Sequence, residues 1–162
     1  MAINRRSRIA ILRGAKIVIT EVGSYESNML DIAARAEVSR ATVYNHFVDK
    51  EEMMLSLLES EINRLVTLAK VAASKREALV KLSRAISEDP ALRRMVKTDP
   101  EEIAKFVTMG GHPLWTLIKS SLVDLFGSSS GLILHWLIGQ VGSPLTPAES
   151  EEQAVLLTRT LA

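Results

Sequence analysis

The sequence contains no cysteine, which excludes disulfides, thiolate zinc sites and cysteine nucleophiles together. Its longest strongly apolar run, residues 131–139, falls far short of the roughly 20 residues that a membrane-spanning helix needs. Residues 1–6 are polar and basic, and no apolar stretch of signal-peptide type follows them. We therefore expect a cytoplasmic protein with no membrane partner.

Net charge of one sign is also nearly absent, because the formal net charge is only +1. Its distribution says more than its size. Residues 1–50 hold eight Lys or Arg and five Asp or Glu, a net charge of +3, whereas the remaining residues hold 12 and 14, a net charge of −2. A positive head on a slightly negative body is typical of an element that docks on phosphates. Composition alone leaves a chance fluctuation of surface charge open.

The patterning is helical throughout. No sustained alternation of apolar and polar residues and no Asn-Gly or Asp-Gly hairpin signal occurs. Capping-box spacing at 49–52 and 74–77, and a cap residue before proline at 89–90, 99–100 and 146–147, mark helix starts. Together with the apolar spacing, these signals predict an all-α fold with helices near 7–22, 28–36, 40–47, 50–73, 75–88, 91–97, 100–109, 113–126, 131–142 and 147–161.

Residues 27–47 predict a helix-turn-helix. A first short helix, begun by Asn28, has its inner face at 32–36, and Glu37–Val38 makes a tight connection. Ser39 then caps a second helix that buries Val43 and Phe47. Two short helices on a turn of three to four residues form this unit. We expect a three-helix DNA-binding domain at 1–48, followed by a helical ligand-binding and dimerisation domain at 49–162.

The outward face of the second helix suits a duplex groove. Arg40, at its start, can pair bidentately with guanine, and Asn45 can do the same with adenine. Phosphate contacts are predicted for Thr42, Tyr44, His46 and, beyond the helix, Lys50. The alternative is an amphipathic hairpin in a bundle core, which needs no such cluster on one exposed face.

A family resemblance supports the same interpretation. The run Asp31-Ile32-Ala33-x-Arg35-Ala36-x-Val38-Ser39-Arg40-x-Thr42-Val43-Tyr44-x-His46-Phe47, followed by Asp49-Lys50-Glu51-Glu52-Met53, closely resembles the DNA-binding domain of the tetracycline-repressor (TetR) family. The resemblance covers roughly residues 7–55. It implies an all-α homodimer, a ligand-binding body, and repression relieved by a small molecule. It also implies DNA contacts for Arg40, Thr42, Tyr44, Asn45, His46 and Lys50, and a phosphate-facing start of the first short helix at Ser27 and Asn28.

Two features depart from the family pattern. Glu37 occupies a turn position where the family usually has glycine, and a left-handed conformation there would cost a non-glycine residue roughly 1 kcal/mol. The stretch around residues 73–75 is also short, which leaves open whether a loop is missing from this chain.

The last two predicted helices are the expected dimer interface, because residues 132–141 are apolar nearly all round. Two such helices from each subunit would form a four-helix bundle and place the recognition helices ~34 Å apart. The expected interface residues are Leu132, Ile133, Trp136, Leu137, Val155 and Leu156. Burial within a single chain is the alternative.

A pocket for a small hydrophobic ligand is predicted between helices 50–73, 100–109 and 113–126. Its candidate lining residues are Met109, His112, Trp115, Thr116 and Lys119. Packing in the core is the alternative for Trp115 in particular. No cofactor is expected.

Two further patterns carry no chemistry. Residues 127–131 fit Gly-x-Ser-x-Gly, but that nucleophile motif needs a preceding strand and here a helix precedes it. His112 and His135 have no acidic partner at ligand spacing, so no metal site is expected. The chain is predicted to be a non-enzymatic, ligand-responsive transcriptional regulator: a repressor that binds a pseudo-palindromic operator as a dimer and is released by a small molecule. A helical dimeric ligand-binding or adaptor protein that has lost DNA binding is the alternative.

Overall fold

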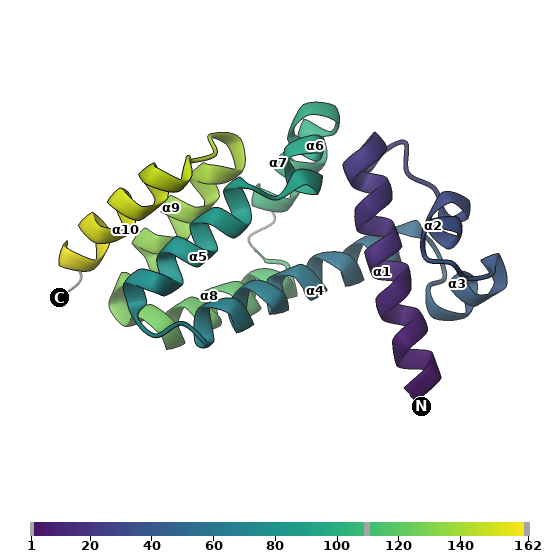
Figure 1. Cartoon of the computed structure of the whole chain (residues 1–162), viewed down its shortest axis with the longest axis horizontal. Helices are drawn as coiled ribbons and strands as arrows, with labels where there is room; N and C mark the ends of the chain where they lie inside the picture. Colours follow the sequence, from purple (N-terminus) through teal and green to yellow (C-terminus); the bar gives the residue numbers. More distant parts are fainter. Residues whose placement is uncertain (1, 109–110, 161–162) are drawn as a thin grey trace. The chain divides into compact units, whose positions relative to one another are not determined.

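The computed structural model describes residues 2–108 and 111–160, and all regular structure within these ranges is helical (Figure 1). The elements are α1 (Ala2–Val22), α2 (Met29–Arg35), α3 (Arg40–His46), α4 (Lys50–Lys70), α5 (Lys75–Ser87), α6 (Pro90–Thr98), α7 (Pro100–Thr108), α8 (Pro113–Phe126), the 3₁₀ turn η1 (Gly127–Ser129), α9 (Ser130–Gly142) and α10 (Pro147–Thr160). The predicted all-α fold is confirmed. Helix α1 begins five residues earlier than the sequence predicts, and α4 ends three residues earlier.

The chain forms two compact units. The first comprises residues 1–61 and 90–102, and the second comprises residues 62–89 and 103–162. Helix α4 runs from the first unit into the second, and α6 belongs to the first although it follows α5 in sequence. The domain boundary expected after residue 48 stays a prediction.

The first unit is built on one apolar stripe of α1. Ile11, Ala15 and Ile19 recur at helical spacing and are all fully or nearly fully buried. Side chains from α2, α3, α4 and α6 complete the same core, namely Ile32, Val43, Met53 and Ala91 among others. Helix α1 packs against both α2 and α6. The stripe on α1 therefore positions the helix-turn-helix.

Helices α1 and α2 cross closely at Gly14. A Cβ atom at this position would lie 2.9 Å from both the amide nitrogen of Ala36 and the carbonyl oxygen of Ile32. These neighbours are backbone atoms, which cannot rotate away as a side chain would. Glycine at this position is therefore required by the crossing.

The turn between α2 and α3 is tight. The Val38 N–H donates to the Ala33 carbonyl at 3.1 Å, and Glu37 has φ = 55°. Among the described residues, Glu37 is the non-glycine residue with positive φ. The left-handed conformation considered for Glu37 is thus confirmed, and it carries a cost of about 1 kcal/mol relative to glycine.

Asp99, between α6 and α7, completes the turn between α1 and α2. Its carboxylate accepts hydrogen bonds from the Ser24 N–H at 2.9 Å and the Tyr25 N–H at 2.8 Å. The Thr98 hydroxyl donates to the same group at 2.5 Å. A Cβ atom at Gly23, which has φ = 91°, would lie 2.6 Å from the Asp99 Oδ2 atom. Glycine therefore allows both the turn and the approach of the carboxylate.

The environment of Asp99 favours its charged form. Burial raises the pKa of Asp99, but the hydrogen bonds from Thr98, Tyr25 and Ser24 and the charge of Lys50 outweigh it and lower the pKa below its ordinary value of 3.8. A depressed pKa in the folded state means that the ionised carboxylate stabilises the fold.

The second unit packs α5, α8, α9 and α10 around a shared core. Helix α5 packs against both α9 and α10, and α8 packs against α9. The core contains Leu79 from α5, Leu122 and Phe126 from α8, and Ile133 and Leu137 from α9. These residues lie at helical spacing within each element, so each helix buries one face.

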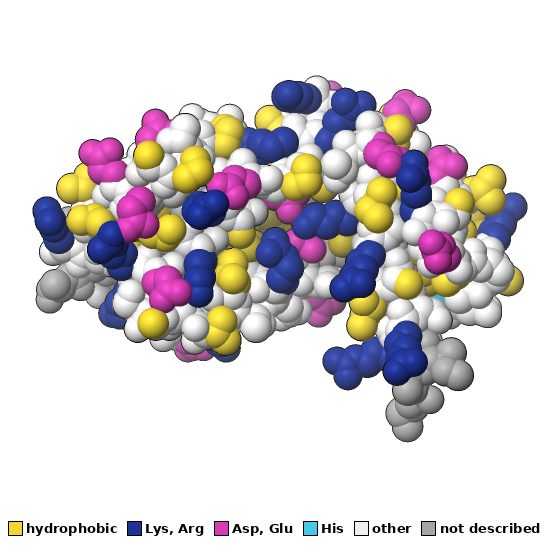
Figure 2. Space-filling view, viewed as in Figure 1, with side chains coloured by type: hydrophobic (Ala, Val, Ile, Leu, Met, Phe, Trp, Pro, Cys, Tyr) yellow, Lys and Arg dark blue, Asp and Glu magenta, His cyan; other side chains and the backbone are white. Residues whose placement is uncertain are grey.

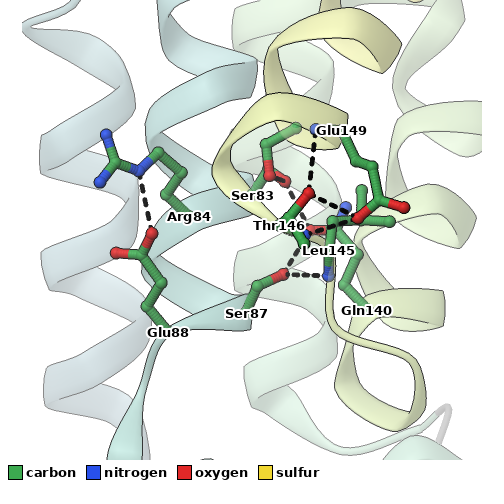
Figure 3. Close-up of polar contacts among 9 residues, drawn as sticks. Ser83, Arg84, Ser87, Glu88, Gln140, Leu145, Thr146 and Glu149 are labelled. Carbon is green, nitrogen blue, oxygen red and sulfur yellow. Dashed lines mark hydrogen bonds and ion pairs between the residues drawn. The ribbon is translucent and has the colours of Figure 1, made fainter.

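A buried polar cluster joins α5, α9 and α10 in this unit (Figure 3). The Ser83 hydroxyl donates to the Gln140 side-chain oxygen at 2.7 Å and lies 2.7 Å from the Ser150 hydroxyl oxygen. The Ser87 hydroxyl donates to the same Gln140 oxygen at 3.1 Å and accepts from the Leu145 N–H at 3.0 Å. Because buried polar groups without partners are costly, the cluster specifies how these three helices pack.

Residues 113–142 are long and apolar enough to cross a membrane, judged by length and composition alone. The backbone breaks within this segment at Gly127, where φ is 61°. Helices α8 and α9 on either side of the break pack against each other. The segment is therefore a helical hairpin within the second unit.

Replacing Glu37 with glycine should stabilise the protein. Glycine adopts positive φ without steric cost, so we expect Glu37→Gly to raise the free energy of unfolding by about 1 kcal/mol and the midpoint of thermal unfolding by about 2–4 °C. Circular dichroism melts measure both. Glu37→Ala is the control, since it removes the same charge but keeps the Cβ atom, and an equal gain in this variant would contradict the backbone explanation.

Replacing Asp99 with asparagine should destabilise the protein in a pH-dependent manner. We expect a loss of about 2 kcal/mol at pH 7, because an ionised hydrogen-bond acceptor is removed. The difference in the free energy of unfolding between the wild-type protein and the variant is fully present above about pH 4. It shrinks as the pH falls through the lowered pKa of Asp99. Urea unfolding at pH 7 and at pH 3 measures it. Asp124→Asn, at an exposed position on α8, is the control, and a loss for Asp99→Asn that does not change with pH would contradict the prediction.

Candidate nucleic-acid interface

Helix α3 is fixed at both ends and along one face. The Ser39 hydroxyl caps its start by accepting from the Thr42 N–H at 3.0 Å. Val43 is fully buried, and Phe47, directly after the helix, is 1% exposed. Cap and anchors agree with those predicted from the sequence. Because a seven-residue helix is not stable alone, this packing determines where its other face points.

The other face of α3 is polar and accessible. Arg40, Tyr44 and Asn45 are exposed, and Thr42 and His46 are half-buried. The Arg40 guanidinium lies over the Tyr44 ring, 5.4 Å from its centroid. The Thr42 hydroxyl oxygen is 2.8 Å from that of Ser39. The structure thus brings together the five outward residues of α3 that the sequence predicted.

The residues predicted at the start of α2 are engaged within the protein. The Asn28 side-chain oxygen accepts from the N–H groups of Leu30 and Asp31, so Asn28 is the N-cap of α2, as expected. Ser27 is 3% exposed, and its hydroxyl donates to the Ser24 carbonyl at 2.6 Å. Ser27 therefore holds the turn, and its side chain lies inside the unit.

Lys50 also holds this turn. Its ammonium donates to the carbonyls of Tyr25 at 2.9 Å and Ser27 at 2.8 Å. Two of its three hydrogens are used in this way, which leaves one for another acceptor. Lys50 in α4 and Asp99 between α6 and α7 therefore bind the same short segment, residues 24–27, although they come from two separate parts of the chain. Sequence patterns identified Asp99 only as a helix cap, because its partners lie about 75 residues away.

Arg8 connects three helices of the first unit. Its guanidinium donates to the Ser56 hydroxyl on α4 at 2.9 Å and lies 5.1 Å from the centroid of the Phe47 ring. An arginine above an aromatic face is attracted by the ring's negative charge density. Arg8 thereby supports the end of α3, a role that its place in a basic N-terminal sequence did not indicate.

The residues predicted to line a ligand pocket differ in their surroundings. Met109 lies outside the described residues. His112 caps α8 through its Nδ1 atom, and Trp115 is 5% exposed, donates to the Phe106 carbonyl at 2.9 Å and stacks on the Phe106 ring. Thr116 and Lys119 are exposed. A different hollow in the second unit, of about 190 Å³, lies beside Ala69, Ala78 and Phe126.

The predicted interface residues fall into three groups. Leu132 on α9 and Leu156 on α10 are 53% and 55% exposed. Trp136 and Val155 are half-buried, and the Trp136 indole N–H donates to the Gln153 side-chain oxygen at 2.7 Å. Ile133 and Leu137 are buried in the core of the second unit. Their side chains are already covered within one chain.

Ser129 lies in the 3₁₀ turn η1, between two helices. Within residues 2–108 and 111–160, no group of three or more His, Asp or Glu side chains is placed to hold a metal ion.

Comparisons with known proteins agree with the helix-turn-helix geometry. The family described as "Bacterial regulatory proteins, tetR family" matches residues 11–57. An HTH-type transcriptional regulator of Mycobacterium tuberculosis is 36% identical over 78 residues, which are 48% of this chain and 41% of that protein. The HTH-type transcriptional repressor AcnR of Corynebacterium efficiens is 27% identical over 110 residues, 62% of this chain and 56% of that protein. The matches thus span about half the length of these curated relatives.

Among solved structures, the fatty acid degradation regulator FadR from Bacillus halodurans has a TM-score of 0.65 at 20% identity, with 93% of each chain covered. At this identity the likeness concerns the fold, and it extends over both units. The family match falls on α1 to α4, where the recognition helix, its cap and its anchors lie. Residues 11–57 thus match the tetR family of bacterial regulatory proteins, and the curated relatives that cover this region are HTH-type transcriptional regulators.

Proposed function

We propose that the protein is a transcriptional repressor that binds a pseudo-palindromic operator as a homodimer and is released by a small hydrophobic molecule. The observation that carries the proposal is the division of α3 into two faces. Val43 and Phe47 anchor one face, and Arg40, Tyr44 and Asn45 are exposed on the other. An Arg and an Asn on one accessible helix face match the two commonest bidentate contacts to guanine and adenine.

Other side chains have supporting roles in this proposal. Thr42, Tyr44 and His46 contact backbone phosphates, and Lys50 offers its remaining hydrogen to one. Asn28 and Ser27 keep the start of α2 in place beside the duplex through their caps and hydrogen bonds. Glu37 adopts the left-handed conformation of the turn, so the substitution keeps the connection between α2 and α3.

The dimer forms through α9 and α10 in this proposal. Leu132 and Leu156 are large apolar side chains that are more than half exposed, and Trp136 and Val155 are half-buried. A second copy of the chain would cover these side chains. Ile133 and Leu137 would support the interface from the core beneath it.

Release by a ligand is assigned to the second unit. The name of AcnR, a repressor, supports repression, and that of FadR, a regulator of fatty acid degradation, supports a small apolar molecule as the signal. The candidate residues within the described part of the chain are His112, Trp115, Thr116 and Lys119, and Trp115 stacks on Phe106. Native mass spectrometry of the purified protein tests for a bound ligand.

Replacing Arg40 or Asn45 with alanine should reduce sequence preference. Each good bidentate contact contributes about 1–3 kcal/mol of discrimination, so we expect each variant to lose roughly 5- to 150-fold of the wild-type preference for its selected duplex over random DNA. Selection from a random duplex pool followed by fluorescence anisotropy measures it. Arg35→Ala is the matched control, because Arg35 is exposed on α2 and pairs with Glu21. Equal affinity of the wild-type protein for selected and random duplexes would sink the proposal.

Replacing Leu132 or Leu156 with glutamate should weaken the dimer. A charge buried against an apolar partner surface is costly, so we expect the dimer dissociation constant to rise at least about tenfold in either variant. Sedimentation equilibrium measures the constant. Val71→Glu is the control, because Val71 is 70% exposed and follows α4 outside the proposed interface. A wild-type protein that remains monomeric at micromolar concentration would contradict the assignment.

A further inference from the structure

An open groove lies in the first unit between the start of α1 and the end of α3. It is formed by Asn4, Arg5, Arg6, Arg8 and Ile9 on one side and by Asn45 and His46 on the other. Asn45 and His46 also belong to the outward face of α3. The groove therefore adjoins the surface proposed to read DNA, although its other wall comes from a different helix.

The groove exists because α1 continues past its own core. The buried stripe of α1 begins at Ile11, and one turn earlier Arg8 takes the corresponding place on the helix. The helix nevertheless continues back to Ala2. Arg8 holds this extension in position, since it binds Ser56 and lies over the ring of Phe47.

The charge of the groove is uncompensated. Arg5 and Arg6 are exposed, and neither has an ion pair or hydrogen bond within the described part of the chain. The side chains that line the groove include no Asp or Glu. In Figure 2 the charged side chains visible at the N-terminal end of α1 are all Lys or Arg. Neighbouring guanidinium groups without acidic partners create a local positive potential that attracts anions.

The shape of the groove favours a polymer backbone over a small enclosed anion. It is open to solvent, and its walls are side chains of two helices with Ile9 as an apolar element between them. Arginine presents a planar fork of donors that fits phosphate oxygens bidentately. A DNA strand passing along α3 offers such oxygens at regular spacing along its backbone.

We propose that Arg5 and Arg6 bind backbone phosphates of the operator in this groove, and so extend the DNA contact of the helix-turn-helix onto α1. The inference rests on the proposed function, because it takes the same duplex as partner. It adds a sequence-independent contact, made by side chains outside α2, the turn and α3.

The salt dependence of DNA binding tests the proposal. Each phosphate contact contributes about 0.9 to the slope of log K against log salt concentration. Because Arg5→Ala/Arg6→Ala removes four cations from a dimer, it should lower the slope by roughly 3.6. At 0.1 M salt the dimer of the double variant should bind roughly 100- to 4000-fold more weakly. The ratio of affinities for selected and random duplexes should stay at the wild-type value, because phosphates carry no sequence.

Two further variants separate charge and position from folding. Arg5→Lys/Arg6→Lys keeps both charges and should keep the slope. Arg13→Ala removes one exposed charge of α1 outside the groove and should leave the slope unchanged. Phosphate-ethylation interference on the wild-type complex should show at least one phosphate whose modification weakens the wild-type protein but leaves the double alanine variant unaffected.

The proposal fails if the wild-type protein binds its selected duplex and the double alanine variant has the same slope. It also fails if Arg13→Ala lowers the slope, for each charge removed, by as much as Arg5→Ala/Arg6→Ala does. Loss of sequence preference in the double variant, without a change in slope, contradicts it as well. A wild-type protein without preference for any duplex contradicts the proposed function itself. Failure of the proposed function can be told apart from failure of this inference, because it is observed with the wild-type protein alone, before any variant is measured.

Discussion

The burial of Phe47 and Val43 is the interaction on which the proposed DNA-facing surface of α3 depends. Helix α3 has seven residues and would not persist alone in water. Its direction is set by these two side chains in the core of the first unit and by Arg8 above the Phe47 ring. Every outward side chain of α3 takes its position from that anchoring. A change at Phe47 would therefore alter the DNA-facing surface without touching any residue on it.

The same core explains why α6 belongs to the first unit. Ala91 joins the core beside α1, and Asp99 then meets the N–H groups of Ser24 and Tyr25. Lys50 binds the carbonyls of the same segment. The N–H groups and the carbonyls of this turn are thus satisfied by opposite charges from two other parts of the chain. A fragment ending at residue 48 would lack both groups.

Local signals in the sequence were sufficient for the parts of the site that are local. Asn28 and Ser39 cap α2 and α3 as predicted, because a cap is a contact over two or three residues. The left-handed conformation of Glu37 was expected instead from the family resemblance, because the family usually has glycine at this turn position. The structure of this part could be predicted because each contact lies within one turn of its own sequence.

Contacts between distant segments could not be found in that way. Nothing near Asp99 indicates that its partners are Ser24 and Tyr25, and the close crossing at Gly14 depends on the path of α2. Helix α9 is apolar nearly all round, so its sequence did not show that Ile133 faces the core while Leu132 is exposed. The direction of each side chain is decided there by the neighbouring helices.

The charged residues of the first unit divide into two groups with different energetic consequences. Arg8, Lys50 and Asp99 are bonded within the protein and hold its helices in place. Arg5 and Arg6 are exposed and have no partner within the described residues. Arg8 must break an internal contact before it meets a phosphate, and Lys50 has one hydrogen left for one. Arg5 and Arg6 have only water to displace. The fold therefore keeps available those cations whose transfer to DNA costs least, and fixes those on which the recognition helix depends.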